Sequence, residues 1–306
     1  MVANMKKQSV SYTWKQMKKK RNGYLFAAPF MVLFGLFTVV PVLISLFYGF
    51  TYYNVLESPR FIGFENYINL FLRDDVFITA IKNTFVFAMV TGPVSYILCL
   101  LFAWFINELN RFLRTLLTIL FYAPSISGGA YMIFAIIFNS DRYGLMNGLL
   151  IRMGFISEPV AWFQDPRYML IIIIIVSLWM SLGTSFLAFI AGLQSVDRSL
   201  YEAGAVDGIK TRWHELWYIT LPAMKPQLMF GAVLAISSSF AVSTVCNALC
   251  GFPSADYAAH TIVAHLEDYG TLRFDMGYAS AIATLLFLLM IGTNKLVNIL
   301  LRRVGE

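Results

Sequence analysis

Residues 202–226 read EAGAVDGIKTRWHELWYITLPAMKP, a short polar island between two long apolar runs. Ser199 and Glu202 have the spacing of a capping box, which predicts a short helix that begins near Leu200. Gly208 can adopt the left-handed backbone conformation that ends a helix. We call this stretch the 202–226 loop, and we expect its first half to be a short helix with a glycine stop.

The second half of the loop predicts another short helix. Thr211 is a suitable N-cap, and Pro222 and Pro226 interrupt the chain before the next apolar run. Between these points, side chains suited to one helix face recur at helical spacing, namely Trp213, Leu216, Trp217 and Thr220. The loop should form a compact knob at a membrane surface, although an interfacial helix without a partner fits the same pattern.

The composition is that of a polytopic membrane protein. Of 306 residues, 58% are hydrophobic and 13% are charged, and the mean hydropathy is +0.68. The net charge of +6 is concentrated at the N-terminus, which suits an anionic membrane surface and does not indicate nucleic-acid binding. Cys99, Cys246 and Cys250 lie in or beside apolar runs, so we expect free buried thiols rather than a metal site.

Six apolar runs each reach the roughly 20 residues needed to cross a bilayer. The first is too long for a signal-peptide core and lacks a clear cleavage site, so it is expected to remain as a span. Pro124, Gly128 and Gly129 predict a break or kink within the third run. The runs cover residues 24–50, 83–106, 113–138, 168–193, 227–249 and 277–301.

The distribution of charge predicts that both termini lie in the cytoplasm. With that orientation, sixteen of the 23 Lys and Arg residues fall in cytoplasmic segments, and seven of those sixteen lie within residues 1–23. Acidic residues gather in the opposite loops, as Asp74, Asp75 and Glu267 illustrate. The same orientation places the 202–226 loop in the cytoplasm.

The sequence contains no catalytic or nucleotide-binding motif. It has no Walker-type glycine loop, no His-Glu-x-x-His motif and no paired intramembrane carboxylates, so neither ATP binding nor hydrolytic catalysis by this chain is expected. Lys295 is the nearest candidate for an intramembrane charge, but it can extend toward the cytoplasmic interface, which disfavours an ion-driven transporter. His214, His260 and His265 are interpreted as solvated loop histidines.

Three patterns in the loop resemble the EAA signature of permeases of binding-protein-dependent ABC importers: Glu202-Ala203-Gly204, Asp207-Gly208 and Ile219-Thr220-Leu221-Pro222. Gly204 stands where that family more often has alanine, a change that keeps the residue small. The resemblance implies an all-α polytopic membrane protein of the MetI-like type I importer fold, with six transmembrane helices and the N-in/C-in topology. It assigns to ATPase coupling the residues Glu202, Ala203, Gly204, Asp207, Gly208, Leu221 and Pro222.

Other segments resemble the sugar-importer branch of that family. They are Phe26 with Pro29 at the first run, residues 61–67 in the first external loop and residues 277–281 at the start of the last run. Residues 250–253, Cys-Gly-Phe-Pro, depart from the Gly-Gly-Pro turn that the family often shows. The resemblance therefore covers nearly the whole chain after the first 23 residues.

The resemblance implies a permease subunit that moves a carbohydrate, expected to be an oligosaccharide, across the cytoplasmic membrane of a prokaryote. Its expected partners are a second homologous permease subunit, two ATPase subunits that bind ATP and Mg, an extracytoplasmic solute-binding protein and the lipid bilayer. No cofactor, metal or nucleic acid is expected on this chain. The alternatives are the same role for another solute, such as a polyol, glycerol phosphate or amino acid, or a non-transporting membrane scaffold or sensor.

The chain is expected to have three parts. A basic cytoplasmic segment (1–23) precedes a first transmembrane arm with an external loop (24–77), and the core transmembrane domain with five helices follows (78–303). The external loop should contain a short interfacial helix, because amphipathic spacing relates Phe64, Tyr67, Leu70 and Phe71.

A route for a sugar needs hydrogen-bonding groups and aromatic rings inside the membrane. Ser and Thr also join membrane helices to one another, so such residues do not by themselves mark a route. The candidates for the substrate path are Trp179, Thr184, Ser238, Ser239, Ser243 and Asn247.

Overall fold

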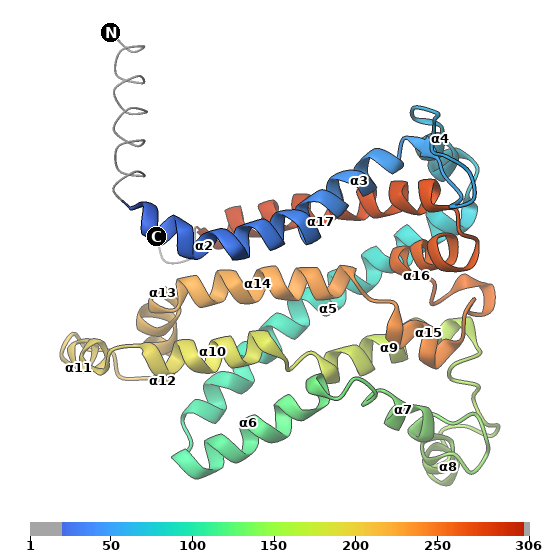
Figure 1. The fold of residues 1–306 in the computed structure, drawn as a ribbon. Coiled ribbons are helices and arrows are strands. Elements are labelled where there is room, and N and C mark those ends of the chain that lie inside the picture. The colour runs from blue at the N-terminus through green and yellow to red at the C-terminus, as the bar shows by residue number, and fades with distance from the viewer. Residues whose placement is uncertain (1–19, 303–306) are drawn as a thin grey trace.

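The structure, a computed structural model, describes residues 20–302 and is mostly helical (Figure 1). The basic residues expected at positions 1–19 and Arg303 lie outside the described residues. Within the described part, β1 (Thr51–Tyr52) and β2 (Arg60–Phe61) pair as an antiparallel hairpin between the first two long helices.

The N-terminal half begins with one long helix that contains Pro29 and a π-helical segment. A short helix is present where the interfacial helix was expected around Phe64, namely α4, which begins at Glu65. The Asp74 carboxylate accepts a hydrogen bond from the Phe77 amide at 2.9 Å and caps α5. The helices of this half are α2 (Arg21–Phe34), η1 (Gly35–Val39), α3 (Val40–Tyr48), α4 (Glu65–Leu72), α5 (Asp75–Asn107), α6 (Arg111–Ile126), α7 (Met132–Ile137) and α8 (Leu145–Arg152).

In the C-terminal half, short helices connect the long ones at both ends of the bundle. Pro166 and Pro226 each lie in the first turn of a helix, where a missing amide donor costs nothing. The helices are α9 (Pro166–Met180), α10 (Thr184–Ser195), α11 (Arg198–Val206), α12 (Arg212–Glu215), η2 (Leu216–Thr220), α13 (Leu221–Ala223), α14 (Lys225–Phe240), α15 (Thr244–Cys250), η3 (Ala255–Tyr257), α16 (Ile262–Glu267), η4 (Asp268–Leu272) and α17 (Met276–Arg302).

Five helical segments of the described chain are long and apolar enough to cross a membrane. The third apolar run is instead divided into α6, with 16 residues, and α7, with six. The break expected from Pro124, Gly128 and Gly129 is thereby confirmed, because α6 ends at Ile126. The five segments are Arg21–Tyr48, Asp75–Asn107, Pro166–Ser195, Lys225–Cys250 and Met276–Leu300.

The long helix α5 runs diagonally through the bundle and packs against α9, α10 and α14 (Figure 1). Small residues bring these helices close together. A methyl group on Gly231 of α14 would lie 2.4 Å from Cζ of Phe189 of α10, and Phe189 is fully buried. Cys99 and Cys246 are buried free thiols, as expected, whereas Cys250 is a free thiol that is only half-buried.

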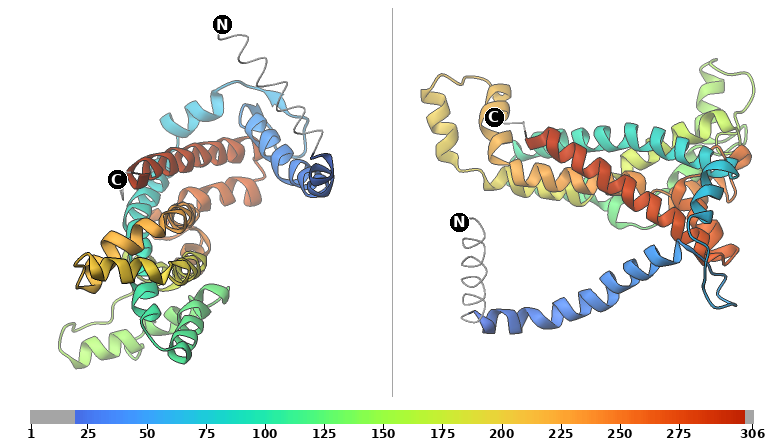
Figure 2. Two further views of the ribbon diagram at one scale, coloured as in Figure 1. Left: turned by 90° about the vertical axis from the view of Figure 1, so that its left-hand side faces the viewer. Right: turned by 90° about the horizontal axis from the view of Figure 1, so that it is seen from above.

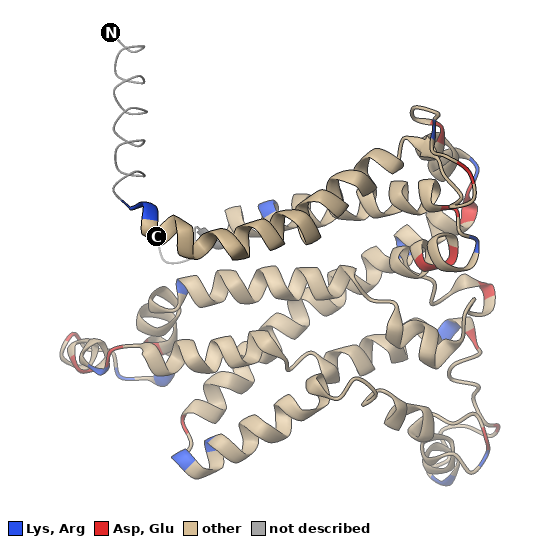
Figure 3. Cartoon of the chain, viewed as in Figure 1, with Lys and Arg blue, Asp and Glu red and all other residues tan. Residues whose placement is uncertain are grey.

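Charged side chains lie mainly at the two ends of the bundle and leave its middle nearly uncharged (Figure 3). One end, which we call the α11 end, carries α11–α13 together with the start of α2 and the end of α17; the opposite end, the α4 end, carries α4, α8 and α16 (Figure 1). The segment Arg21–Tyr48 contacts α17 through α3 and diverges from the bundle toward its own N-terminus (Figure 2). None of the apolar window of this segment is buried against the rest of the chain.

Gly231→Val is expected to reduce the thermal stability of the protein in detergent, because the added side chain overlaps the ring of Phe189. Overpacking of this kind costs about 1–3 kcal/mol of unfolding free energy. The matched control is Gly292→Val in α17, where a Cβ meets no atom within 4 Å. Equal unfolding temperatures for the two variants would contradict this account of the α10–α14 contact.

Candidate functional site

Two membrane-crossing segments are interrupted in their interiors. The first breaks at residues 181–183, between α9 and α10, and the second breaks at residues 241–243, between α14 and α15. Gly183 has φ −109° and ψ −135°, and Ser243 has φ −148° and ψ −46°, so neither residue is helical. Unwound backbone at membrane depth is tolerated only where protein or a polar cavity satisfies its hydrogen bonds.

A cavity of about 270 Å³ lies where these two breaks meet α5. None of its lining residues is charged. The Oγ atom of Ser177 is buried there and has no hydrogen-bond partner. Hydroxyl groups line the cavity, among them those of Thr91, Ser95, Ser177, Ser181, Ser238 and Ser243.

The structure brings together three of the six residues predicted for a substrate path. Ser238, Ser239 and Ser243 line the cavity. Trp179 instead packs its ring against Phe134 at 5.2 Å, and neither it nor Thr184 and Asn247 is among the lining residues.

Three contributors to this region were missed from the sequence. Thr91 and Ser95 of α5 line the cavity, but single hydroxyl groups in an apolar run carry no distinctive pattern. Glu267 was assigned to an external loop. In the structure its carboxylate accepts hydrogen bonds from Ser243 Oγ at 2.7 Å and from Asn247 Nδ2 at 2.8 Å.

The 202–226 loop forms the knob of short helices at the α11 end (Figure 1). The capping box expected at Ser199 is wrong, because α11 begins at Arg198, two residues before the expected start at Leu200. The side chain of Asp197 is the cap and accepts a hydrogen bond from the Ser199 amide at 3.0 Å. Glu202 lies one turn further on and forms an exposed ion pair with Arg198 at 3.4 Å.

The two glycines of the loop have different reasons for being small. Gly208 has φ +93°, which confirms the left-handed stop, and a Cβ there would meet no atom within 4 Å. Gly204 is buried, and a Cβ there would lie 2.6 Å from Cδ1 of Ile219. Gly204 therefore allows α11 to pack against the second half of the loop itself.

The second half of the loop is attached to the helix bundle. Thr211 caps α12, as expected, by accepting a hydrogen bond from the His214 amide at 3.3 Å. The ring of Trp213 lies 5.0 Å from that of Trp104 in α5. Arg212 forms an ion pair with Glu108, which follows α5, at 3.3 Å. The loop is therefore connected to α5 by both an aromatic contact and an ion pair.

The residues assigned to ATPase coupling fall into two groups. Glu202, Ala203, Asp207 and Gly208 are exposed on α11 and its end, and next to them the side chain of Val206 is 88% exposed. The remaining residues face the chain itself, with Gly204 buried and Leu221 and Pro222 half-buried. The exposed group forms a surface of this chain that is open to a partner.

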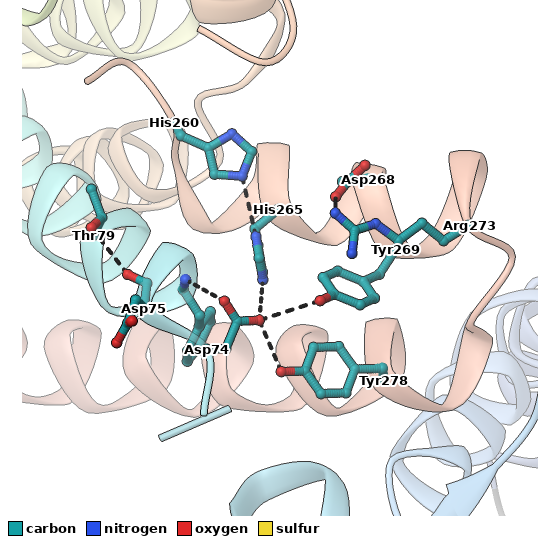
Figure 4. Close-up of polar contacts among 10 residues, drawn as sticks. Asp74, Asp75, Thr79, His260, His265, Asp268, Tyr269, Arg273 and Tyr278 are labelled. Atoms are coloured by element: carbon teal, nitrogen blue, oxygen red, sulfur yellow. Dashed lines mark hydrogen bonds and ion pairs between the residues drawn. The ribbon is translucent and has the colours of Figure 1, made fainter. Parts of the chain in front are cut away.

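A cluster of titratable side chains lies at the α4 end (Figure 4). The Oδ2 atom of Asp74 accepts hydrogen bonds from His265 Nε2 at 3.0 Å and from the Tyr278 hydroxyl at 2.9 Å. His260 Nε2 lies 3.2 Å from His265 Nδ1. The expectation of solvated histidines is wrong for His260 and His265, which are 3% and 2% exposed, whereas His214 is exposed.

The environment of this cluster shifts two pKa values. Burial opposes ionisation of Asp74, but hydrogen bonds from His265 and the Phe77 amide lower its pKa to about 2. Burial lowers the pKa of His260 to about 4, and the neighbouring His265 adds to that shift. Near pH 7 Asp74 is therefore ionised and His260 is neutral. The cluster ties the start of α5 to α16 and α17, which are separated from it by nearly 200 residues.

Comparison with known proteins identifies relatives along almost the whole chain. Residues 16–306 match the family described as "Binding-protein-dependent transport system inner membrane component". The chain is 32% identical to "Probable ABC transporter permease protein YesP" of Bacillus subtilis (strain 168) over 92% of each chain. It is 31% identical to "Lactose transport system permease protein LacF" of Rhizobium radiobacter, over 69% of this chain and 70% of that one.

Two further matches extend this result. The chain is 29% identical to "Arabinooligosaccharides transport system permease protein AraP" of Bacillus subtilis (strain 168), over 91% of this chain and 88% of that one. Its fold matches a chain in the crystal structure of a bacterial ABC transporter involved in the import of the acidic polysaccharide alginate. That match has a TM-score of 0.77 and 24% identity, and it covers 96% of this chain and 100% of the other.

Asp74→Asn is expected to lower the thermal stability in detergent, because the amide can still cap α5 but presents an NH₂ group to donors that need an acceptor. The loss should be about 1–3 kcal/mol. The pKa of Asp74 is lowered, so the stabilisation from its ionised form is complete above about pH 4 and is lost as the pH falls through about 2. The loss should therefore be smaller near pH 2 than at pH 5.

The control for this measurement is Asp75→Asn, which removes the neighbouring exposed carboxylate. A loss that was as large near pH 2 as at pH 5, or that the control reproduced, would contradict the assignment of Asp74 as the ionised centre of the cluster.

Proposed function

The chain belongs to the binding-protein-dependent transport system inner membrane component family, and from this membership we propose that it is a permease subunit of an ATP-driven importer that moves a carbohydrate across the cytoplasmic membrane of a prokaryote. Two relatives are named for lactose and for arabinooligosaccharides, which supports a sugar, and an oligosaccharide in particular, as the solute. The chain itself then needs no catalytic residue, and ATP with Mg is hydrolysed on separate ATPase subunits.

The observation that carries this proposal is the hydroxyl-lined cavity at the two helix breaks. Interrupted membrane helices that expose backbone groups to a central cavity are the usual construction of a transport site. Hydroxyl groups and an unpartnered Ser177 Oγ suit a solute rich in hydroxyl groups.

The exposed face of α11 is the proposed contact to an ATPase subunit. With six spans, α6 and α7 counting together as one broken span, both termini and the 202–226 loop lie in the cytoplasm. Glu202, Ala203, Val206 and Asp207 then face the ATPase. Gly204, Leu221 and Pro222 contribute by holding α11 against the body of the permease.

The segment Arg21–Tyr48 is proposed to contact a second, homologous permease subunit. Its apolar window is unburied within this chain, and it diverges from the bundle (Figure 2). A detached apolar helix of this kind can be covered by lipid or by a partner, and pairing of two permeases would supply the partner. The chain then divides as expected into a basic segment (1–23), an arm with an external loop (24–77) and a core (78–303).

An extracytoplasmic solute-binding protein is the proposed partner at the α4 end, in keeping with the description of the family. The external loop, α4 and the beginnings of α5 and α17 surround a polar hollow of about 640 Å³ there. Arg60, Glu65, Arg73 and Asp75 line it, so it offers charges of both signs to a protein surface.

The proposal is tested by gentle purification of the chain from its native membrane, followed by identification of the proteins that accompany it. A second permease and an ATPase are expected. ATP hydrolysis by the reconstituted complex should rise with binding protein and one member of a panel that contains lactose and arabinooligosaccharides. Recovery of the chain alone would favour a scaffold or sensor, and stimulation only by polyols, glycerol phosphate or amino acids would reject the carbohydrate.

Val206→Asp is expected to weaken association with the ATPase at least tenfold, because a carboxylate would be buried in an apolar contact. The side chain is 88% exposed in this chain, so the fold and membrane insertion should not change. The matched control is Leu56→Asp, a 91% exposed apolar residue in the external loop. The amount of ATPase that co-purifies with each variant measures the effect, and equal recovery would contradict the assigned face.

A further inference from the structure

Glu267, at the end of α16, is a carboxylate without a countercharge. One of its oxygens accepts from Ser243 Oγ at 2.7 Å and the other accepts from Asn247 Nδ2 at 2.8 Å. Among residues 20–302, no Lys, Arg or His forms an ion pair with it. Both oxygens are thus held by neutral donors.

Ser243 joins this carboxylate to the cavity. Its side chain lines the cavity at the break before α15, and the same Oγ donates to Glu267. Asn247 follows one turn later on α15. Ser243 therefore connects the wall of the cavity to an amide and a carboxylate on the α4 side of the cavity.

The position of Glu267 is fixed by the structure around it. Thr261 caps α16 and also donates to the Val242 carbonyl at the helix break, at 2.7 Å. His265, two residues before Glu267, is held by Asp74 (Figure 4). The hydroxyl of Thr271 donates to the Glu267 carbonyl at 2.5 Å. A side chain on so constrained a backbone can act as a specific ligand rather than as a mobile surface charge.

The chemistry of the three side chains suits an uncharged sugar. An ionised carboxylate is an acceptor only, and the hydroxyl groups of a sugar can donate to both of its oxygens. Sugar hydroxyls can also accept from the serine and the amide. In the structure the Ser243 hydroxyl and the Asn247 amide both donate to the Glu267 carboxylate. A sugar would replace these hydrogen bonds with hydrogen bonds from its own hydroxyl groups. A carboxylate, sulfonate or phosphate on the solute would instead meet a like charge.

We propose that Glu267, with Ser243 and Asn247, selects uncharged sugars on the solute route and rejects saccharides that carry an acidic group. This inference rests on the proposed function, because it assumes that a carbohydrate passes through this chain. The solved transporter of the same fold is involved in the import of an acidic polysaccharide. The fold alone therefore does not set the charge of the solute.

The test measures binding to the permease directly, so that selection by the binding protein does not contribute. The whole complex is placed in lipid nanodiscs, and saturation-transfer NMR compares two probes of equal length, arabinotriose and a trisaccharide of galacturonate. The wild-type complex should bind arabinotriose and not the acidic probe. Glu267→Gln should raise binding of the acidic probe relative to the neutral one by about tenfold, because it removes the like-charge contact.

Two controls separate charge from folding. Glu267→Asp keeps the charge and should keep the rejection of the acidic probe. Glu158→Gln removes an exposed carboxylate from another loop and should change nothing. All variants must co-purify with the partner subunits in equal amount.

The outcomes distinguish the two proposals. If the wild type binds the acidic probe, or if Glu267→Gln leaves the ratio of the two probes unchanged, selection by Glu267 is overturned while carbohydrate import stands. If the wild type binds neither probe and no sugar stimulates its ATPase, the proposed function fails and the inference fails with it.

Discussion

The need to satisfy backbone hydrogen bonds inside a bilayer constrains this structure more than any other interaction. A membrane helix meets that need along its whole length, and an interruption leaves several amide and carbonyl groups without helical partners. Two segments nevertheless break in their interiors, at residues 181–183 and 241–243. The chain meets part of the cost with side chains, since Ser181 Oγ donates to the Leu178 carbonyl and Thr261 Oγ1 to the Val242 carbonyl. Residues of both breaks, among them Ser181 and Ser243, line the cavity, so the cavity lies where the two helices are interrupted.

Much of the fold could be predicted from the sequence because each membrane helix is marked by a long continuous run of apolar residues. Five of six apolar runs became continuous or nearly continuous spans, and Pro124 with its two following glycines predicted the break in the other. Local turn chemistry was also readable, since Gly208 and Thr211 act as expected. The capping box failed because Asp197, two residues before Ser199, is the N-cap and accepts from the Ser199 amide, so the helix already includes Ser199.

The polar groups of the site were harder to predict because their partners are distant in the chain. Asp74 and His265 are 191 residues apart, and nothing in either local sequence distinguishes a buried pair from two solvated loop residues. The role of Glu267 was missed for a similar reason, since in the sequence it looks like one more external carboxylate, and only the fold brings it to Ser243 and Asn247. Gly204 shows a subtler limit. The sequence indicates that a small residue is needed, but only the packing shows that the neighbour is Ile219 of the same loop.

The contacts of the 202–226 loop with the helix bundle determine which helices would move if α11 were displaced. The Tyr201 hydroxyl lies 2.9 Å from Thr220 Oγ1, and Gly204 packs on Ile219, so α11 cannot move without the second half of the loop. That half continues through η2 and α13 into α14, which carries the second helix break. Through Arg212 and Trp213 it is also attached to α5, the helix that lines the other side of the cavity. A displacement of the exposed face of α11 would therefore be transmitted to α14 and to α5, which lie on two sides of the cavity. These two helices need not move by the same amount.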